Sequence, residues 1–228
     1  MMETYSSKVK QLVKEVLNIQ RNKTGWTFWK NENAVDIYYK LSSYFNGNMY
    51  KFVTEIDGPH DMVYDVMKPT SSPEISMEWD KSIQSYELIK TISTDVFIGR
   101  VTTFPAVLGL ISAREFLNLY VLKTFSDFSE STQINSKYGK VSWIFAESIA
   151  LPECPETKDY VRVANYPGGF AIVENKKNPS KSLVEMFINC DIGGMLPRSL
   201  IEAALPSQQI LYIQGVKAEV KKRMNQRK

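Results

Sequence analysis

Short segments rich in β-branched and aromatic residues make up most of this chain, and they constrain its fold more than any other feature. Such segments, separated by tight turns like Ser93-Thr94-Asp95, are typical of β-strands. Parallel neighbours need a crossover of roughly a dozen residues or more, so the short connections predict antiparallel pairing. About nine or ten strands are expected. The segments are 35–39, 50–56, 86–92, 96–103, 115–123, 141–149, 160–165, 170–174 and 183–191.

Helical spacing of apolar residues replaces this pattern at both ends of the chain and once in between. The spacing predicts an N-terminal helix over 1–22 and a short helix over 58–67 that starts with Pro59. A long helix over 196–224 has apolar residues that need a large apolar partner to cover them. We therefore expect one α+β domain over 1–228, in which a curved antiparallel sheet grips the C-terminal helix.

Alternation along the strands indicates which side chains face the inside of this sheet. The charged residues Glu115, Glu147 and Glu185 are expected to point outward, which places their immediate neighbours inside. The inward set is apolar or small, with a few hydroxyls and amides. It suits a packed core or a cavity for a hydrophobic ligand with one or two polar groups, and we leave both open. Its members are Phe116, Asn118, Tyr120, Leu122, Ser142, Ile144, Ala146, Ser148, Met186, Ile188 and Cys190.

The sequence offers little for catalysis or metal binding. His60 is the only histidine, which excludes zinc and iron sites that need a histidine pair. Cys154 and Cys190 are not spaced as a metal or redox pair, and their number favours a reducing, cytoplasmic location. The first thirty residues contain no apolar run that resembles a signal peptide or membrane span, and no phosphate-binding or nucleophile motif occurs in the sequence. We expect no catalytic residue, no metal and no cofactor.

The formal net charge of +3 is distributed unevenly along the chain. The last twelve residues carry six basic side chains and one acidic one, whereas residues 1–216 carry 22 basic and 24 acidic ones. This distribution argues against a broad nucleic-acid-binding face. The basic C-terminus is either a solvated end or a segment attracted to an anionic membrane.

Arg114 is a charged residue at the start of an apolar strand, where its guanidinium needs a binding partner. A buried arginine must be paired with an anion, bonded to backbone carbonyls or solvated. Structural anchoring is the favoured role, and ligand contact is the alternative.

Several motifs, in this order and spacing, resemble the START (StAR-related lipid transfer) domain family, in particular its small single-domain cytosolic sterol and bile-acid carriers. The resemblance covers most of the chain. Ile111-Ser112-Ala113-Arg114-Glu115-Phe116 stands where the family has I-S-P-R-D-F, with Ala113 and Glu115 as departures. The other motifs are Thr24-Gly25-Trp26, Gly47-Asn48-Met49-Tyr50, Glu78-Trp79-Asp80, Asn165-Tyr166-Pro167-Gly168-Gly169-Phe170 and Leu196-Pro197-Arg198-Ser199-Leu200-Ile201.

The resemblance implies the helix-grip fold and a lipid tunnel whose lid is the C-terminal helix together with the loop 102–110. Members that resemble the steroidogenic protein have a buried acid–arginine pair near the sterol hydroxyl, but here those positions are Val101 and Tyr120. The expected ligand-binding residues are Val101, Thr103, Leu108, Arg114, Phe116, Asn118, Tyr120, Ser142, Ser148, Ile188 and Leu211. The expected membrane or lid residues are Phe104, Val107, Leu110, Lys221, Lys222 and Arg223. Arg100 is expected to be a surface cation on the opposite side of its strand.

These observations predict a monomeric, non-enzymatic carrier that encloses one sterol, bile acid or related lipid and contacts membranes transiently. The alternative is a sensor or buffer with the same cavity, which signals to a protein partner instead of delivering its ligand. An enzyme on the same scaffold is a third option, but Cys190 is the only inward residue assigned that titrates in a useful range.

Overall fold

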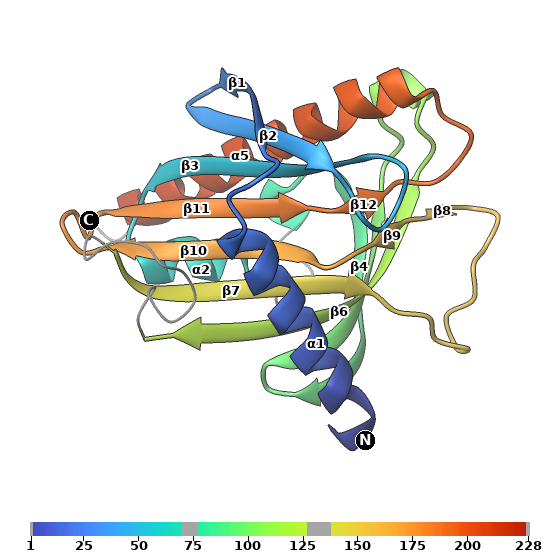
Figure 1. The fold of residues 1–228 in the computed structure, drawn as a ribbon, viewed down its shortest axis with the longest axis horizontal. Coiled ribbons are helices and arrows are strands. Elements are labelled where there is room, and N and C mark those ends of the chain that lie inside the picture. The colour runs from blue at the N-terminus through green and yellow to red at the C-terminus, as the bar shows by residue number, and fades with distance from the viewer. Residues whose placement is uncertain (1, 70–76, 127–137, 227–228) are drawn as a thin grey trace.

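A computed structural model describes residues 2–69, 77–126 and 138–226. Its main feature is a ten-stranded, strongly curved sheet in the order β1-β2-β3-β11-β10-β7-β6-β5-β4, with β8 paired to β6 (Figure 1). The strands are β1 Thr27–Glu32, β2 Val35–Leu41, β3 Asn48–Asp57, β4 Ile83–Ser93, β5 Val96–Thr103, β6 Arg114–Phe125, β7 Tyr138–Ser148, β8 Val161–Arg162, β10 Gly168–Asn175 and β11 Lys181–Ile188. The short strands β9 (Ala164–Asn165) and β12 (Cys190–Asp191) form a separate pair.

Antiparallel pairing is confirmed along the whole path from β1 to β4. The exception is β8, which pairs with the first two residues of β6 in parallel. The expected strands 160–165 and 183–191 are each divided, into β8 and β9 and into β11 and β12. Strand β1 has no counterpart among the expected segments, because its sequence Thr-Phe-Trp-Lys-Asn-Glu is polar at one end and lies at the edge of the sheet.

The helices include α1 (Met2–Arg21), α2 (His60–Met67) and α5 (Arg198–Gln226), and a 3-10 turn, η1, is present at Val107–Gly109. All three expected helices are therefore present, each within two residues of the expected ends. No described helix is long and apolar enough to cross a membrane.

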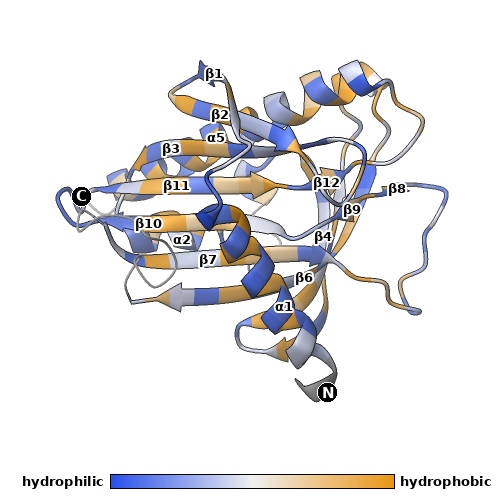
Figure 2. Ribbon diagram, viewed as in Figure 1, coloured by the Kyte–Doolittle hydropathy of each residue, from blue (hydrophilic) through white to orange (hydrophobic). Residues whose placement is uncertain are grey.

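The sheet has a hydrophobic layer on each face. On the concave face, α2 and α5 pack against β2, β3, β7, β10 and β11 through residues such as Val63, Ile213 and Val216. On the convex face, α1 lies across the sheet at β7 (Figure 1). It covers Trp143, Phe145 and Phe187, and the first two of these are fully buried. Figure 2 shows the corresponding alternation of hydrophobic and hydrophilic residues along the strands. The curved sheet thus grips α5, as expected, while its outer face forms a second core.

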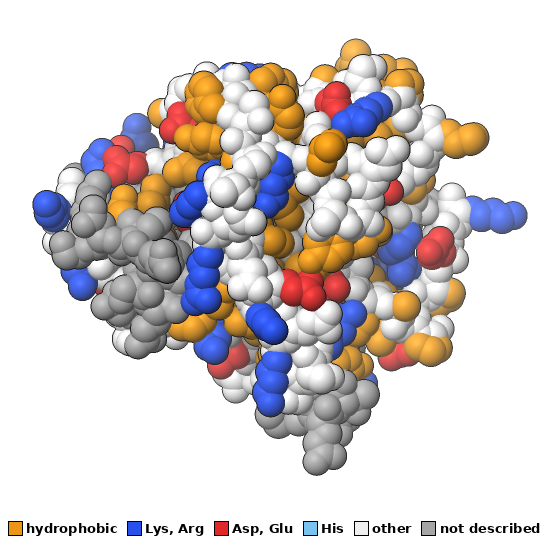
Figure 3. Space-filling view, in the orientation of Figure 1, with side chains coloured by type: hydrophobic (Ala, Val, Ile, Leu, Met, Phe, Trp, Pro, Cys, Tyr) orange, Lys and Arg blue, Asp and Glu red, His pale blue; other side chains and the backbone are white. Residues whose placement is uncertain are grey.

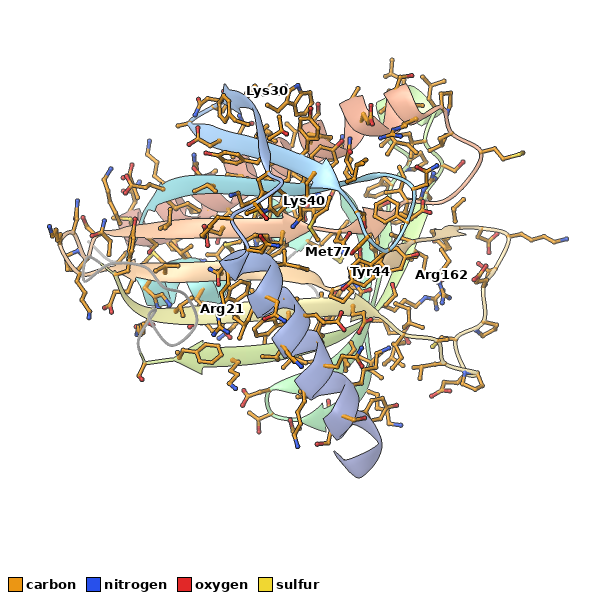
Figure 4. All side chains as sticks on the ribbon, viewed as in Figure 1. Arg21, Lys30, Lys40, Tyr44, Met77 and Arg162 are labelled. Carbon is orange, nitrogen blue, oxygen red and sulfur yellow. The ribbon has the colours of Figure 1, made fainter. Side chains whose placement is uncertain are left out.

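Polar contacts fix α1 in place on that outer face. Gln20 Nε2 donates a hydrogen bond to the buried carboxylate of Glu185 at 2.7 Å. Tyr44, labelled in Figure 4, donates one from its Oη to Glu15 Oε2 at 2.7 Å. Basic side chains lie along and beside α1 (Figure 3). The sequence placed Glu185 correctly on the outward side, but α1 shields that side from solvent.

Candidate functional site

A cavity of about 350 Å³ lies between the concave face of the sheet and α5. This volume falls within the range of roughly 300–1,000 Å³ that is usual for small-molecule sites. The inner faces of β4 to β7, β10 and β11 form one wall. Ala204, Leu205, Gln208, Gln209 and Tyr212 of α5 form the other.

Seven of the eleven residues expected to bind ligand line this cavity. All seven come from the strands β5, β6 and β11, at the positions that alternation placed inside or beside the motif of Arg114. The seven residues are Val101, Thr103, Arg114, Phe116, Asn118, Tyr120 and Ile188. These residues remain candidates for ligand contact.

The other four expected residues do not line the cavity. Leu108 is fully exposed in η1, and Leu211 is 58% exposed because it lies one position before Tyr212, on the far side of α5. Ser142 is buried farther along β7, where its hydroxyl pairs with that of Thr124 at 2.8 Å. Ser148 donates to Asn118 Oδ1 and to the carbonyl oxygen of Val163, at the end of β7.

Sequence reasoning missed an aromatic group on the β4 and α5 side of the cavity. Trp79, Tyr86 and Tyr212 all line it. The β4–β5 pairing contains three register shifts, so simple alternation does not fix the face of Tyr86. The glycine Gly99, in the interior of the neighbouring strand, was an available signal, because glycine in a strand often marks the close approach of another group.

Arg114 is almost fully buried, with 5% of its surface exposed. Its Nε donates to the carbonyl oxygen of Ile192 at 2.8 Å and its Nη1 to that of Ser112 at 2.5 Å, while Nη2 donates to that of Gly193 at 3.3 Å. These bonds tie the turn after β12 to the segment before β6, so the expected anchoring is present. Burial lowers the pKa of Arg114, and no carboxylate in the described part of the chain forms an ion pair with it. The guanidinium is therefore a cation that lines the cavity.

Glu115, the next residue, points away from the cavity and is fully buried between two arginines. Its Oε1 accepts from Arg100 Nε at 2.6 Å, and its Oε2 accepts from Arg162 Nε at 2.6 Å. Arg162 also binds the carbonyl oxygens of Cys154 and Pro155, which fixes the loop before β8 (Figure 4). Arg100 thus lies on the expected side of β5, where its partly exposed side chain pairs with Glu115 and Glu87.

Two titratable residues, Cys190 and His60, have clear positions. Cys190 lines the cavity, and burial raises the pKa of its thiol to about 12, which leaves it protonated and weakly nucleophilic at neutral pH. His60 is buried at the start of α2, with Nδ1 3.0 Å from Asp61 Oδ1, and it does not line the cavity. In the described residues, no group of three or more His, Cys, Asp or Glu side chains is placed to hold a metal ion.

The segment at one rim of the cavity exposes apolar side chains. Phe104 lines the cavity and is half exposed, while Leu108 and Leu110 point into solvent. Val107 and Leu108 both have positive φ angles, 51° and 55°, which is unusual for a β-branched residue such as Val107. Met195, in the turn before α5, is also fully exposed and was missed by the sequence analysis.

Two of the three basic residues expected to contact a membrane already form ion pairs within the protein. Arg223 Nε bonds to Glu219 Oε1 at 2.8 Å, and Lys222 lies 3.6 Å from Glu219 and 4.0 Å from Glu78. Lys221 is exposed and forms no ion pair with any described residue. Lys221 is sixteen residues from Leu205 at the cavity, which corresponds to about 24 Å along the helix.

A curved antiparallel sheet that grips a long C-terminal helix around an internal cavity defines the class of helix-grip proteins. Within that class, the family model of the START domain matches residues 8–225 of this chain. The chain therefore belongs to the START domain family.

Known proteins agree with this assignment over nearly the full length. The chain is 28% identical to StAR-related lipid transfer protein 5 of Bos taurus, over 92% of this chain and 93% of that protein. It is 29% identical to the human StAR-related lipid transfer protein 6, over 92% of this chain and 89% of that protein. The solved structure of human StAR-related lipid transfer protein 5 shares the fold with a TM-score of 0.86, at 23% identity, over 98% of this chain and all of that one.

Proposed function

We propose that this protein binds one sterol, bile acid or related lipid and transfers it between membranes without altering it chemically. The observation that carries the proposal is the cavity between the sheet and α5, which is lined mainly by apolar side chains and has a few polar groups. The names of its relatives as lipid transfer proteins support the same function. We further propose that it acts in the cytoplasm as a monomer.

The physical need for such a carrier follows from the cost of exposing a lipid to water. At about 0.8 kcal/mol per buried CH₂ group, a sterol-sized body loses more than roughly 10 kcal/mol of favourable burial when it leaves a bilayer. A closed apolar cavity offsets that cost during passage through water. Arg114 adds a cation that suits the carboxylate of an acidic ligand, whereas neutral ligands leave it bonded to carbonyl oxygens.

Access to the cavity requires an opening, because α5 closes one side of it. We propose that the segment 104–110 and α5 move apart at a membrane, where Phe104, Val107, Leu108 and Leu110 are stabilised by the lipid interface. Met195, which is exposed in the turn before α5, is a further apolar side chain that we propose contacts the membrane. The cationic residues Lys221, Lys222 and Arg223 are the proposed electrostatic contact with anionic headgroups.

Native mass spectrometry of the protein purified from cells, with the extracted lipid identified, tests the binding proposal. A single sterol-sized or bile-acid-sized adduct supports it. A bound diacyl lipid would contradict the preference for sterol-like ligands. A sensor with the same cavity is the second candidate, and a liposome assay separates the two, because a sensor binds the lipid without accelerating its transfer.

A further inference from the structure

A gap in the cavity wall at Gly99 brings two tyrosine side chains together. Gly99 of β5 pairs with Leu88 of β4 on one side and with Asn118 of β6 on the other. A Cβ atom at Gly99 would lie 3.2 Å from Tyr86 Oη and 3.2 Å from Tyr120 Cε2. The missing side chain therefore leaves the space in which the phenol of Tyr86 reaches across β5 toward Tyr120.

Neighbouring rings hold this aromatic group in place. The ring of Tyr120 stacks on Phe97, with 5.3 Å between the centroids. On the opposite wall, Tyr212 of α5 packs between Trp79 at 5.4 Å and Phe170 at 5.8 Å. The hydroxyl groups of Tyr120 and Tyr212 therefore project from rings that neighbouring aromatic side chains already hold, which lowers the cost of ordering them on binding.

These groups have more hydrogen-bond donors than acceptors around them. Tyr86 Oη and Trp79 Nε1 are buried and have no partner among the described residues. Tyr120 Oη accepts a bond from Asn118 Nδ2 at 3.3 Å, and no described residue accepts its proton. A buried polar group without a partner is costly, so an oxygen atom supplied from the cavity would stabilise the site.

The group is also uncharged at neutral pH. Burial raises the pKa of Tyr86, Tyr120 and Tyr212, and the phenol of Tyr120 raises those of the other two further. Protonated phenols donate to a neutral oxygen but supply no charge for an anion. Arg114, the cation of the cavity, lies six residues before Tyr120 on the same face of β6, or about 20 Å along the strand.

We propose that Tyr86 and Tyr120, set side by side by Gly99, form a subsite that binds an uncharged hydroxyl or carbonyl oxygen of the lipid. This inference rests on the proposed function, and it adds the orientation of the ligand. The neutral oxygen lies between β4, β6 and α5, and any carboxylate lies toward Arg114. A neutral subsite takes the place of the acid–arginine pair, whose positions here are Val101 and Tyr120.

The test compares two probes that differ in a single hydroxyl group, cholesterol and cholest-5-ene, both supplied from cyclodextrin. Binding of each is measured to the full-length wild-type protein and to the variants Tyr86→Phe and Gly99→Ala. The wild-type protein should prefer cholesterol, and Tyr86→Phe should reduce that preference about threefold to tenfold, the value of one hydrogen bond. Gly99→Ala retains every hydroxyl but displaces the phenol of Tyr86, so it should reduce the preference in the same direction.

Tyr64→Phe is the matched control. This phenol packs against the concave-face core but does not line the cavity, so its removal should leave the preference unchanged. An unchanged preference in Tyr86→Phe and Gly99→Ala, with cholesterol still bound by the wild-type protein, overturns the subsite alone. If the wild-type protein binds neither probe, the subsite and the sterol part of the proposed function are both overturned, and a bile acid remains the proposed ligand.

Discussion

At the scale of a single residue, Arg114 anchors two backbone segments, and we propose that it also contacts a ligand. Its guanidinium bonds to three backbone carbonyl oxygens on two segments, and those bonds use three of its five N–H donors. In the described structure no carboxylate neutralises it, although it lies against an apolar cavity. The side chain therefore keeps the rim of the cavity assembled and leaves positive charge available to a ligand.

The two roles predict different responses to substitution. Arg114→Gln should lower the affinity for cholate at least tenfold more than the affinity for cholesterol, because only cholate carries a carboxylate. Arg114→Lys retains the charge and should recover part of the difference. Binding is measured by calorimetry, with the melting temperature of each variant as a check on anchoring. An equal loss for both ligands would show that Arg114 acts only as an anchor.

Cys190 gives a second prediction at this scale, concerning pH. Because burial raises the pKa of its thiol to about 12, the reactive thiolate is rare at pH 7.5, and its population grows about tenfold with each pH unit up to that value. Iodoacetamide should therefore modify the partly exposed Cys154 first. The rate of Cys190 modification should rise between pH 8 and 10. At any one pH, the rate should be lower when a lipid occupies the cavity. Intact-mass analysis over time measures both sites, and equal rates at pH 7.5 would contradict the prediction.

At the scale of the secondary-structure elements, the features that could be predicted from the sequence are those that depend on the spacing of residues within one strand or helix. Period-two alternation is intrinsic to a strand, so the inward faces of β6, β7 and β11 could be identified from single charged residues such as Glu147. The helix α5 could likewise be recognised by its spacing. These two patterns were sufficient for the helix-grip arrangement and for the part of the cavity wall formed by β6, β7 and β11.

Contacts between elements explain what the sequence could not predict. Outward positions on β7 hold Trp143 and Phe145, and only the placement of α1 shows that a second core covers them. Leu211 is as apolar as a cavity residue, but the rotation of α5 turns it to solvent and turns Tyr212 inward. Register shifts in β4 conceal Tyr86 in the same way. In each case, contacts with another element decide which face of the strand or helix is buried, and the spacing of residues within that element does not show it.

The second core predicts that α1 contributes directly to stability. Leu12 is fully buried against the convex face, so Leu12→Ala should lower the free energy of unfolding by about 3 kcal/mol. Lys14→Ala changes an exposed position on the same helix and should have an effect of less than about 0.5 kcal/mol. Urea denaturation monitored by tryptophan fluorescence compares the two. Equal small effects would mean that α1 separates from the sheet without unfolding it.

At the scale of the whole molecule, the two proposed membrane contacts lie at different ends of α5. The apolar rim, which includes Leu108 and Met195, belongs to the end that lines the cavity, and Lys221 lies about 24 Å farther along the helix. Both can touch a flat membrane at once only if α5 lies nearly parallel to it. The rim would then set the rate of opening, while the basic end would set the time spent near anionic lipid.

This division of roles predicts different salt dependence for two sets of variants. Lys221→Gln, Lys222→Gln and Arg223→Gln together should slow cholesterol transfer between anionic vesicles about tenfold at low salt. The free energy that corresponds to a tenfold change is smaller than the roughly 3 kcal/mol expected for three unpaired cations near an anionic membrane. The reason is that Glu219 already pairs with two of the three. Neutral substitutions are preferred to charge reversal, which would place new carboxylates beside Glu219. The effect should disappear in 0.5 M salt, where the screening length falls to about 4 Å.

The rim variant Leu108→Ser with Met195→Ser should slow transfer at both salt concentrations, because burial of apolar area in the interface does not depend on screening.

Removal of three exposed lysines elsewhere, Lys10→Gln, Lys14→Gln and Lys177→Gln, is the control for net charge. If this control slows transfer as much as the C-terminal variant, overall charge governs the encounter and the basic end of α5 has no special role. If the rim variant transfers cholesterol at the wild-type rate, the cavity must open at another part of its wall, and the strained residues Val107 and Leu108 would have no part in loading.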